Sequence, residues 1–379
     1  MTLAFVNGRI LTPTGFVAGH ALRVDGEHIV DVLSANDARL ANLERVDVSG
    51  RLLLPGYIDT QVNGGGGVLF NEQPDVAGIR AIGAAHRRFG TTGFLPTVIS
   101  DDLSVVARAI DAAQQALDDR VPGVLGIHVE GPFLSTARRG VHDGRYLRRL
   151  DAAQASLLRP MRGGRTLVTL APEAADAGVI ATLVRSGVIV AGGHSDATHE
   201  QANVALAEGL GAFTHLFNAM SPLQSREPGM VGAALHHPSA WCCIIVDGQH
   251  VHPVTLQLAL RCKPHARFVL VTDAMPVVGA AQDWFMLQGQ RIGVVDGTCR
   301  DAEGRLAGTA LDMSAAVRNA VGMLGLPLGT ALCMAAEHPA RMLGLEADVG
   351  LVAPGRRANL VQLDSGLRAV RTWIDGVAL

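Results

Sequence analysis

The sequence has no excess of positive charge, few aromatic residues and no long apolar run. Its 379 residues carry a formal net charge of −3 at pH 7, and 4% of them are aromatic. Because nucleic acids and anionic membrane surfaces are bound by clustered positive charge, neither is expected as a partner. The apolar runs, such as residues 188–191 and 241–246, are far shorter than the ~20 residues that a membrane-spanning helix requires. A soluble protein is therefore predicted.

Cysteine is also scarce, and its pattern excludes a disulfide-stabilised protein. The five cysteines are Cys242, Cys243, Cys262, Cys299 and Cys333, and no two of them form a CxxC pair. An odd number without such a pair indicates small buried thiols in a reducing compartment. The N-terminal segment has no basic region followed by a long apolar region, so no signal peptide is predicted. The expected location is the cytoplasm.

Apolar residues and glycine, by contrast, are abundant. Hydrophobic residues make up 48% of the chain, and its 44 glycines suit a large core whose elements are joined by many tight turns. Short apolar stretches with hairpin signals between them occupy both ends, at residues 3–6, 21–24, 28–33, 360–363 and 371–374. One small β-sandwich domain, formed from residues 1–54 and 350–379, is therefore predicted.

The middle of the chain, residues 55–349, alternates between apolar stretches and alanine-rich amphipathic stretches. The apolar stretches lie at residues 52–59, 92–99, 124–130, 166–171, 188–194, 212–217, 242–246 and 268–273. Eight buried strands that alternate with helices predict a (β/α)8 barrel of the TIM type. An open doubly wound sheet is the alternative, but no GxGxxG fingerprint follows the first strand. The glycine-rich segment 287–308 is predicted to be a hairpin after the eighth strand.

Polar residues stand at the ends of four of these predicted strands. They are Glu130 in His-Val-Glu-Gly-Pro, His194 in Gly-Gly-His-Ser-Asp, His215 in Thr-His-Leu-Phe-Asn and Asp273 in Thr-Asp-Ala-Met. A barrel gathers the C-terminal ends of its strands around one mouth, so these side chains are expected to converge. One glutamate and two histidines form the ligand set of a catalytic zinc-type site, and the remaining aspartate suits a general base.

Each of these residues alone has an ordinary structural explanation. A single histidine at a strand end is more often packed and hydrogen-bonded than a metal ligand, and an aspartate there can cap the next helix. Four such residues at the strand ends of one barrel favour the metal site.

These motifs, together with others along the chain, resemble the N-acetylglucosamine-6-phosphate deacetylases, a family of amidohydrolases. The further matching stretches are Pro-Gly-Tyr-Ile-Asp at 55–59, Arg-Glu-Pro-Gly at 226–229, Val-Asp-Gly-Gln-His-Val at 246–251, Leu-Ala-Gly-Thr at 306–309 and Pro-Gly-Arg-Arg-Ala-Asn-Leu at 354–360. The resemblance covers essentially the whole chain. It implies hydrolysis of N-acetylglucosamine 6-phosphate to glucosamine 6-phosphate and acetate.

The resemblance also implies a role for each matching residue. Glu130, His194 and His215 would bind one divalent metal per subunit, Zn2+ or alternatively Fe2+, Co2+ or Mn2+. Asp273 would be the catalytic acid–base, and His142 would be catalytic and contact the acetyl carbonyl or nearby sugar oxygens. The further substrate-binding residues would be Asn218, Ala219, Arg226 and His250. Arg226 would reach into a neighbouring subunit's site, which implies a homodimer.

Two features separate the chain from many other amidohydrolases. Where those enzymes carry His-x-His after the first strand, this chain has Gln61 and Asn63, and neutral amides bind such ions weakly. Lys263, the only lysine, precedes the eighth strand, so a lysine-bridged pair of metals is excluded. A smaller departure is Asp312, where relatives often carry a hydroxyl residue.

Several alternatives stay open at this point. The galactosamine epimer is a rival substrate, and other amidohydrolase reactions are more distant rivals. A metal-free scaffold is the non-enzymatic alternative. Because lysine is nearly absent, a phosphate site has to use arginine, histidine and backbone N–H groups. Arg226 and His250 fit this need, although Arg226 could instead pair with Glu227. The glycines at 64–67 are either a phosphate cradle or a flexible loop.

Overall fold

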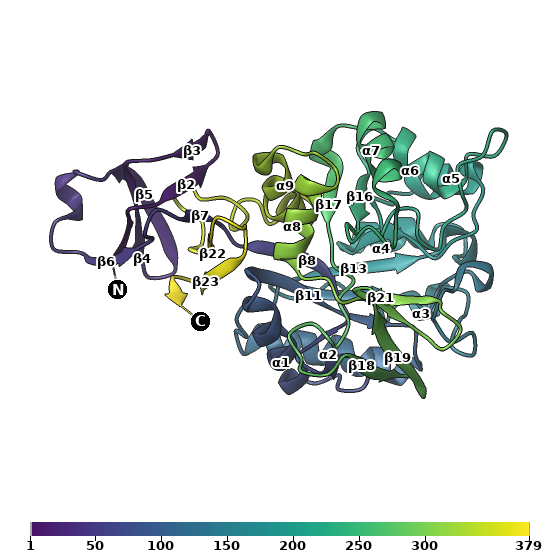
Figure 1. Ribbon diagram of the computed structural model, residues 1–379. Coiled ribbons are helices and arrows are strands. Elements are labelled where there is room, and N and C mark those ends of the chain that lie inside the picture. Colours follow the sequence, from purple (N-terminus) through teal and green to yellow (C-terminus); the bar gives the residue numbers. More distant parts are fainter. Residues whose placement is uncertain (1, 379) are drawn as a thin grey trace.

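A parallel β-barrel forms the core of the larger of two bodies in the molecule (Figure 1). The computed structural model describes residues 2–378. Eight strands pair in the order of the sequence: β8 Tyr57–Val62, β11 Thr91–Ile99, β12 Gly126–Glu130, β13 Arg165–Leu170, β14 Ile189–Gly192, β15 Ala212–Phe213, β16 Trp241–Ile244 and β17 Phe268–Leu270. The barrel closes where Val62 bridges Ala274 in parallel and Asp273 N–H donates to Gln61 O at 3.0 Å. The predicted (β/α)8 fold is confirmed.

Helices surround the barrel because its strands must be covered on their outer faces. All nine residues of β11 are buried, the pattern of a parallel strand that packs on both sides. The covering helices are α1 Val76–Arg87, α2 Leu103–Asp118, α3 Ala152–Ala155, α4 Val179–Ser186, α5 His199–Ala207, α6 Gly229–His236, α7 Pro253–Cys262, α8 Met313–Gly322, α9 Leu328–Ala335 and α10 Glu337–Met342. None of the helices within residues 2–378 is both long and apolar enough to cross a membrane.

Both chain ends form a β-sandwich beside the barrel, as predicted (Figure 1). One sheet contains β1 Thr2–Val6, β4 His20–Asp25, β5 His28–Ser34 and β6 Glu44–Asp47. The other contains β2 Arg9–Thr12, β3 Gly15–Val17, β7 Leu52–Pro55, β22 Leu360–Leu363, β23 Ala369–Ile374 and β24 Val377–Ala378. The two sheets share one apolar core, in which the rings of Phe5 and Trp373 pack edge to face with 5.1 Å between their centroids.

Some predicted strands are shorter in the structure or divided. The stretch 52–59 splits at Gly56, so that β7 belongs to the sandwich and β8 to the barrel. Regular strand pairing ends at Phe213 and Leu270 in the stretches 212–217 and 268–273. The main chain stays hydrogen-bonded to its neighbours beyond these points, since Leu216 N–H donates to Cys243 O and Asp273 N–H donates to Gln61 O. His215 and Asp273 lie in these extensions in left-handed backbone conformations, which regular strands do not contain.

The segment after the eighth strand is larger than the predicted hairpin. It forms a four-stranded antiparallel sheet of β18 Trp284–Leu287, β19 Gln290–Val295, β20 Thr298–Arg300 and β21 Leu306–Thr309. Its apolar face packs on Leu69, Ile99 and Met275. Thr309 N–H donates to Asp273 O, and Met275 N–H donates to Thr309 O, both at 3.0 Å. The sheet therefore fixes the main chain around Asp273.

Candidate metal centre and active site

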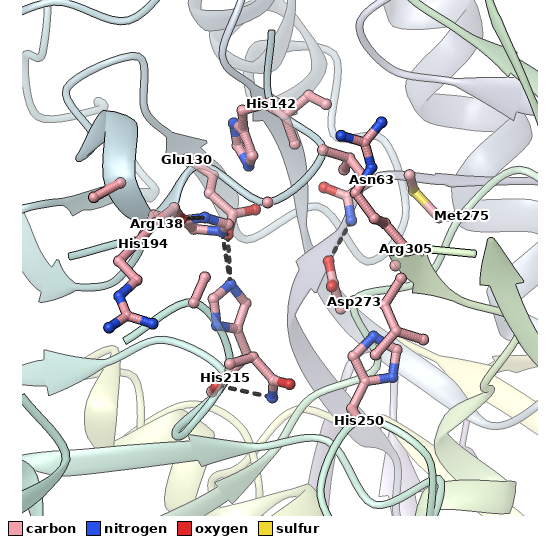
Figure 2. Close-up of a pocket in the computed structure, with 18 residues that line it drawn as sticks. Asn63, Glu130, Arg138, His142, His194, His215, His250, Asp273, Met275 and Arg305 are labelled. Atoms are coloured by element: carbon pink, nitrogen blue, oxygen red, sulfur yellow. Dashed lines mark hydrogen bonds and ion pairs between the residues drawn. The ribbon is translucent and has the colours of Figure 1, made fainter. Parts of the chain in front are cut away.

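A cavity of about 430 Å³ opens at the C-terminal ends of the barrel strands. Figure 2 shows Glu130, His194 and His215 gathered on one side, with Asp273 facing them. The lining residues that the sequence predicted are Glu130, His142, His194, His215, Asn218, Ala219, His250 and Asp273. Of the predicted site residues, Arg226 does not line the cavity of its own chain.

Glu130, His194 and His215 present three donor atoms to one point. His215 Nε2 lies 2.9 Å from Glu130 Oε1, and His194 Nε2 lies 3.3 Å from the same oxygen. The two Nε2 atoms are 3.1 Å apart. An ion with bonds of ~2.0–2.1 Å and tetrahedral geometry would separate its ligand atoms by about 3.3 Å. The three buried donors therefore fit a divalent metal ion.

The protonation of the ligands also suits a cation. His194 Nδ1 lies 3.0 Å from Arg138 O, so Nδ1–H donates to this carbonyl and the Nε2 lone pair faces the site. Burial opposes the charged form of Glu130, but its contacts with the imidazoles of His194 and His215 outweigh this effect and hold the pKa of Glu130 well below its usual range. An ionised carboxylate and a lone pair on nitrogen are the forms in which these side chains bind metals.

The backbone is strained where the chemistry is concentrated. His194, His215 and Asp273 have φ values of 48°, 32° and 53°. Non-glycine residues avoid this left-handed region because Cβ approaches the main chain, and a residue held there costs about 1–3 kcal/mol. In each case the turn directly follows a barrel strand and brings the side chain to the mouth of the barrel.

Asp273 is bound by two amides that belong to the first barrel strand. Asn63 Nδ2 donates to Asp273 Oδ1 at 2.6 Å, and Gln61 Nε2 donates to the same oxygen at 3.1 Å. Burial and the neighbouring charge of Glu130 raise the pKa of Asp273 to about 6. A carboxyl group with such a pKa can accept and release a proton near neutral pH.

His142 is a neutral hydrogen-bond donor. Its ring is buried, and its Nδ1 lies 2.7 Å from Ser100 Oγ and accepts the Ser100 N–H at 3.3 Å. Because Nδ1 is the acceptor, the proton of the neutral ring is on Nε2. Burial lowers the pKa of His142 to about 3. His142 therefore stays neutral at physiological pH with an N–H group to offer at the cavity.

Three further residues that line the cavity, His250, Asn218 and Ala219, offer polar groups that are not metal ligands. His250 Nδ1 lies 2.6 Å from Asp247 Oδ2, so its Nδ1–H donates to this carboxylate. Asn218 Nδ2 donates to His215 O at 3.1 Å, which leaves its Oδ1 for other partners. Among residues 2–378, the Ala219 N–H donates to no backbone or side-chain acceptor. His250, Asn218 and Ala219 all line the cavity.

Arg226 and Lys263 lie away from this cavity. Arg226 is exposed on the loop before α6, and no carboxylate within residues 2–378 forms an ion pair with it. The carboxylate of Glu227 instead accepts the N–H groups of His199 and Gly229, so the alternative pairing with Arg226 is wrong. Lys263 Nζ donates to Ala234 O and His237 O at the C-terminal end of α6. This lysine is structural.

Two other sequence features also prove structural. Asp312 accepts the Ala315 N–H and begins α8. The glycine-rich loop is not a phosphate cradle, because its Gly64, Gly66 and Gly67 N–H groups donate to the carbonyls of residues 274, 278 and 276. Buried His86 lies 2.9 Å from Gly64 O and holds the loop from its other side.

Sequence reasoning missed four polar residues around the site. Asn63, Arg138 and Arg305 line the cavity, and Gln61 lies behind it against Glu130. Gln61 and Asn63 stand where many amidohydrolases carry His-x-His, and alternate strand residues share a face, but sequence reasoning assigned these amides no role beyond that of weak metal ligands. Arg305 lies in the turn between β20 and β21, and its only sequence signal is its place directly before the matching stretch Leu-Ala-Gly-Thr at 306–309.

Comparison with known proteins agrees with this site. The amidohydrolase family model matches residues 52–378. The chain is 45% identical to an N-acetylgalactosamine-6-phosphate deacetylase of Shewanella sp. strain ANA-3, over 86% of this chain and 83% of the relative. It is 37% identical to an N-acetylglucosamine-6-phosphate deacetylase of Homo sapiens, over 99% and 94% of the two chains.

A solved structure extends the likeness to three dimensions. The N-acetylglucosamine-6-phosphate deacetylase of Pasteurella multocida superposes with a TM-score of 0.96 at 36% identity, and the match covers 100% of both chains. The chain therefore belongs to the amidohydrolase family, among the N-acetylglucosamine- and N-acetylgalactosamine-6-phosphate deacetylases.

Proposed function

We propose that the protein hydrolyses the acetamido group of N-acetylglucosamine 6-phosphate to give glucosamine 6-phosphate and acetate. One observation carries the proposal: three buried metal-binding side chains and a carboxylate with a raised pKa face one another across a single cavity. This arrangement suits hydrolysis of an amide, in which a water must lose a proton and a nitrogen must gain one.

The chain's own residues divide the work as follows. Asp273 takes the proton of the attacking water at Oδ2, since Oδ1 already accepts two amide hydrogen bonds. His142 donates its Nε2–H to the acetyl oxygen, where negative charge develops. One such donor is worth about 3 kcal/mol in the transition state. Asp273 then passes its proton to the departing amine nitrogen, and the C–N bond breaks.

Glu130, His194 and His215 would hold the metal ion, for which we propose Zn2+. When bound, a divalent ion supplies Lewis acidity that polarises the acetyl carbonyl and acidifies water. Two imidazoles and one carboxylate with an open fourth position are the ligand set of several catalytic zinc sites. Gln61 and Asn63 direct amide nitrogens rather than acceptor atoms at Asp273, which supports one metal rather than two.

The sugar and its phosphate would lie beyond the acetamido group. We propose that Asn218 and the Ala219 N–H bind sugar oxygens, and that His250 binds the phosphate. The Ala219 N–H, which has no acceptor within residues 2–378, is a donor of the kind that a hydroxyl oxygen requires, and His250 lines the same cavity.

The test is acetate release from three sugars: N-acetylglucosamine 6-phosphate, N-acetylgalactosamine 6-phosphate and unphosphorylated N-acetylglucosamine. We expect the phosphorylated glucosamine compound to have the highest kcat/KM, with a loss of about 100-fold or more when the phosphate is absent, as about 3 kcal/mol for charge-assisted hydrogen bonds implies. No release from any of them, with one metal bound, would point to another amidohydrolase reaction. No release and no metal would point to a scaffold.

The galactosamine epimer is the second candidate substrate. It is favoured by the 45% identity to the Shewanella N-acetylgalactosamine-6-phosphate deacetylase. The epimers differ only in the direction of one hydroxyl group, so the ratio of their kcat/KM values in the same assay decides between them.

We further propose a homodimer in which Arg226 binds the phosphate in the partner's cavity. Its exposed position, without an acidic partner in the described chain, supports this role. Co-expression of Arg226→Ala and Asp273→Asn subunits tests it. In a two-fold dimer every mixed pair holds one intact site, so a random mixture should recover about a quarter of wild-type activity, although each variant alone is nearly inactive. If Arg226 serves its own subunit, no activity returns.

A cytoplasmic location is proposed as well. All five cysteines are free thiols, three of them buried. Free thiols persist in reducing compartments.

A further inference from the structure

Gln61 lies on the first barrel strand, β8, and Asn63 directly follows that strand, so that one residue separates the two. Alternate residues of a strand share a face, and both amides point to the inside of the barrel mouth. Both side chains are nearly inaccessible, with exposed fractions of 1% and 2%. At this position, where many amidohydrolases carry His-x-His, the two amides could simply occupy space without a role in the reaction. Their hydrogen bonds argue otherwise.

The Gln61 amide nitrogen bridges two carboxylates. Its Nε2 lies 3.2 and 3.1 Å from Glu130 Oε1 and Oε2, and 3.1 Å from Asp273 Oδ1. An NH2 group has two hydrogens, so one serves each carboxylate. Two nearby negative charges repel each other, and a shared donor between them offsets part of this repulsion.

Asn63 adds a second donor to the same oxygen of Asp273, at 2.6 Å. Asp273 Oδ1 therefore accepts two hydrogen bonds. Asp273 Oδ2 accepts none from residues 2–378. One carboxylate oxygen is anchored, and the other is left for proton exchange.

The main chain on both sides of this contact is also fixed. On the same face of the strand, the Asp59 carboxylate accepts Thr272 Oγ1–H at 2.5 Å and Thr272 N–H at 3.3 Å. Asp273 N–H donates to Gln61 O at 3.0 Å. The backbone next to Asp273 is thus held by the strand whose side chains hold its carboxylate.

We propose that Gln61 and Asn63, the amide pair, are positioning residues that orient the Asp273 carboxylate with Oδ2 free, and that Gln61 also orients the metal-binding Glu130. This inference rests on the proposed function for the role of Asp273. Within residues 2–378, the hydrogen bonds of the two amide nitrogens go to Asp273 and Glu130, and the pair acts on the reaction through these two carboxylates. Its effect on catalysis is therefore indirect.

Substitutions that keep side-chain size but remove the donors test the amide pair. Asn63→Leu should lower kcat by about 10–100-fold, with KM within about threefold and Zn2+ affinity unchanged, because it touches only Asp273. Gln61→Met should lower kcat similarly and also weaken Zn2+ binding by about tenfold or more, because Glu130 loses its donor. Zn2+ affinity is measured by competition with a chromogenic chelator.

Gln362→Met is the matched control. Gln362 is buried in the β-sandwich, where its Nε2 donates to Val48 O. This variant removes an equally buried amide and should change thermal stability but neither kcat nor Zn2+ affinity. Wild-type kcat in Asn63→Leu, or an equal loss of kcat in Gln362→Met, would overturn the proposal.

The Zn2+ measurement separates this inference from the proposed function. If the wild-type chain deacetylates neither sugar phosphate, the proposed function fails, and weaker Zn2+ binding by Gln61→Met still supports the orientation of Glu130. Unchanged Zn2+ binding by Gln61→Met overturns that part of the proposal whatever the substrate. Should Gln61→Met not fold, Asn63→Leu decides the orientation of Asp273 alone.

Discussion

Asp273→Asn should lower kcat by about 10⁴-fold, because the variant can neither accept the proton of water nor deliver one to the amine. General acid–base catalysis is typically worth ~10²–10⁴-fold, and here one group serves both transfers. An asparagine side chain still accepts the hydrogen bonds of Gln61 and Asn63 through its oxygen. KM and metal content should therefore stay close to wild-type values. Steady-state kinetics with metal analysis of the same sample measures all three.

Asp312→Asn is the matched control for this prediction. Asp312 caps α8 by accepting the Ala315 N–H and does not line the cavity. Because asparagine is an equally good helix cap, activity and stability should both be retained. An Asp273→Asn variant that keeps more than about a tenth of wild-type kcat would be incompatible with a single acid–base group of the usual strength.

Removal of the metal should have an effect of similar size. Dialysis against a chelator is expected to reduce activity by at least about 10³-fold, since the Lewis acid contributes several kcal/mol of transition-state stabilisation. One equivalent of Zn2+ per subunit should restore it, because Glu130, His194 and His215 are the one cluster of potential metal ligands within residues 2–378. A requirement for two equivalents would contradict the single site.

The metal should also stabilise the fold. A ligand present at about 1,000 times its Kd raises the free energy of unfolding by about 4 kcal/mol, and differential scanning calorimetry of the metal-free and loaded protein measures the change.

Added bicarbonate should have no effect on activity. In amidohydrolases with a lysine-bridged pair of metals, bicarbonate can supply the carboxyl group on that lysine. The only lysine of this chain, Lys263, instead donates to Ala234 O and His237 O at the end of α6.

The metal ligands and the acid–base residue could be predicted from local sequence because barrel geometry is regular. Once eight apolar strands were recognised, the residues that end those strands had to meet at one mouth. The approximate strand positions followed from apolar runs of the right length. Their exact ends did not, because His215 and Asp273 follow the last regular strand residues in left-handed conformations, which an apolar pattern cannot reveal.

The sequence by itself determined the β-sandwich, the barrel and the four polar residues at the ends of the barrel strands. Tertiary structure alone decided how those residues are held. Gln61 lies 69 positions from Glu130 and 212 from Asp273, and the Nε2–H tautomer of His142 depends on Ser100, 42 positions away. Periodicity reports which face of an element is buried, but such hydrogen bonds depend on which elements the closed barrel places side by side.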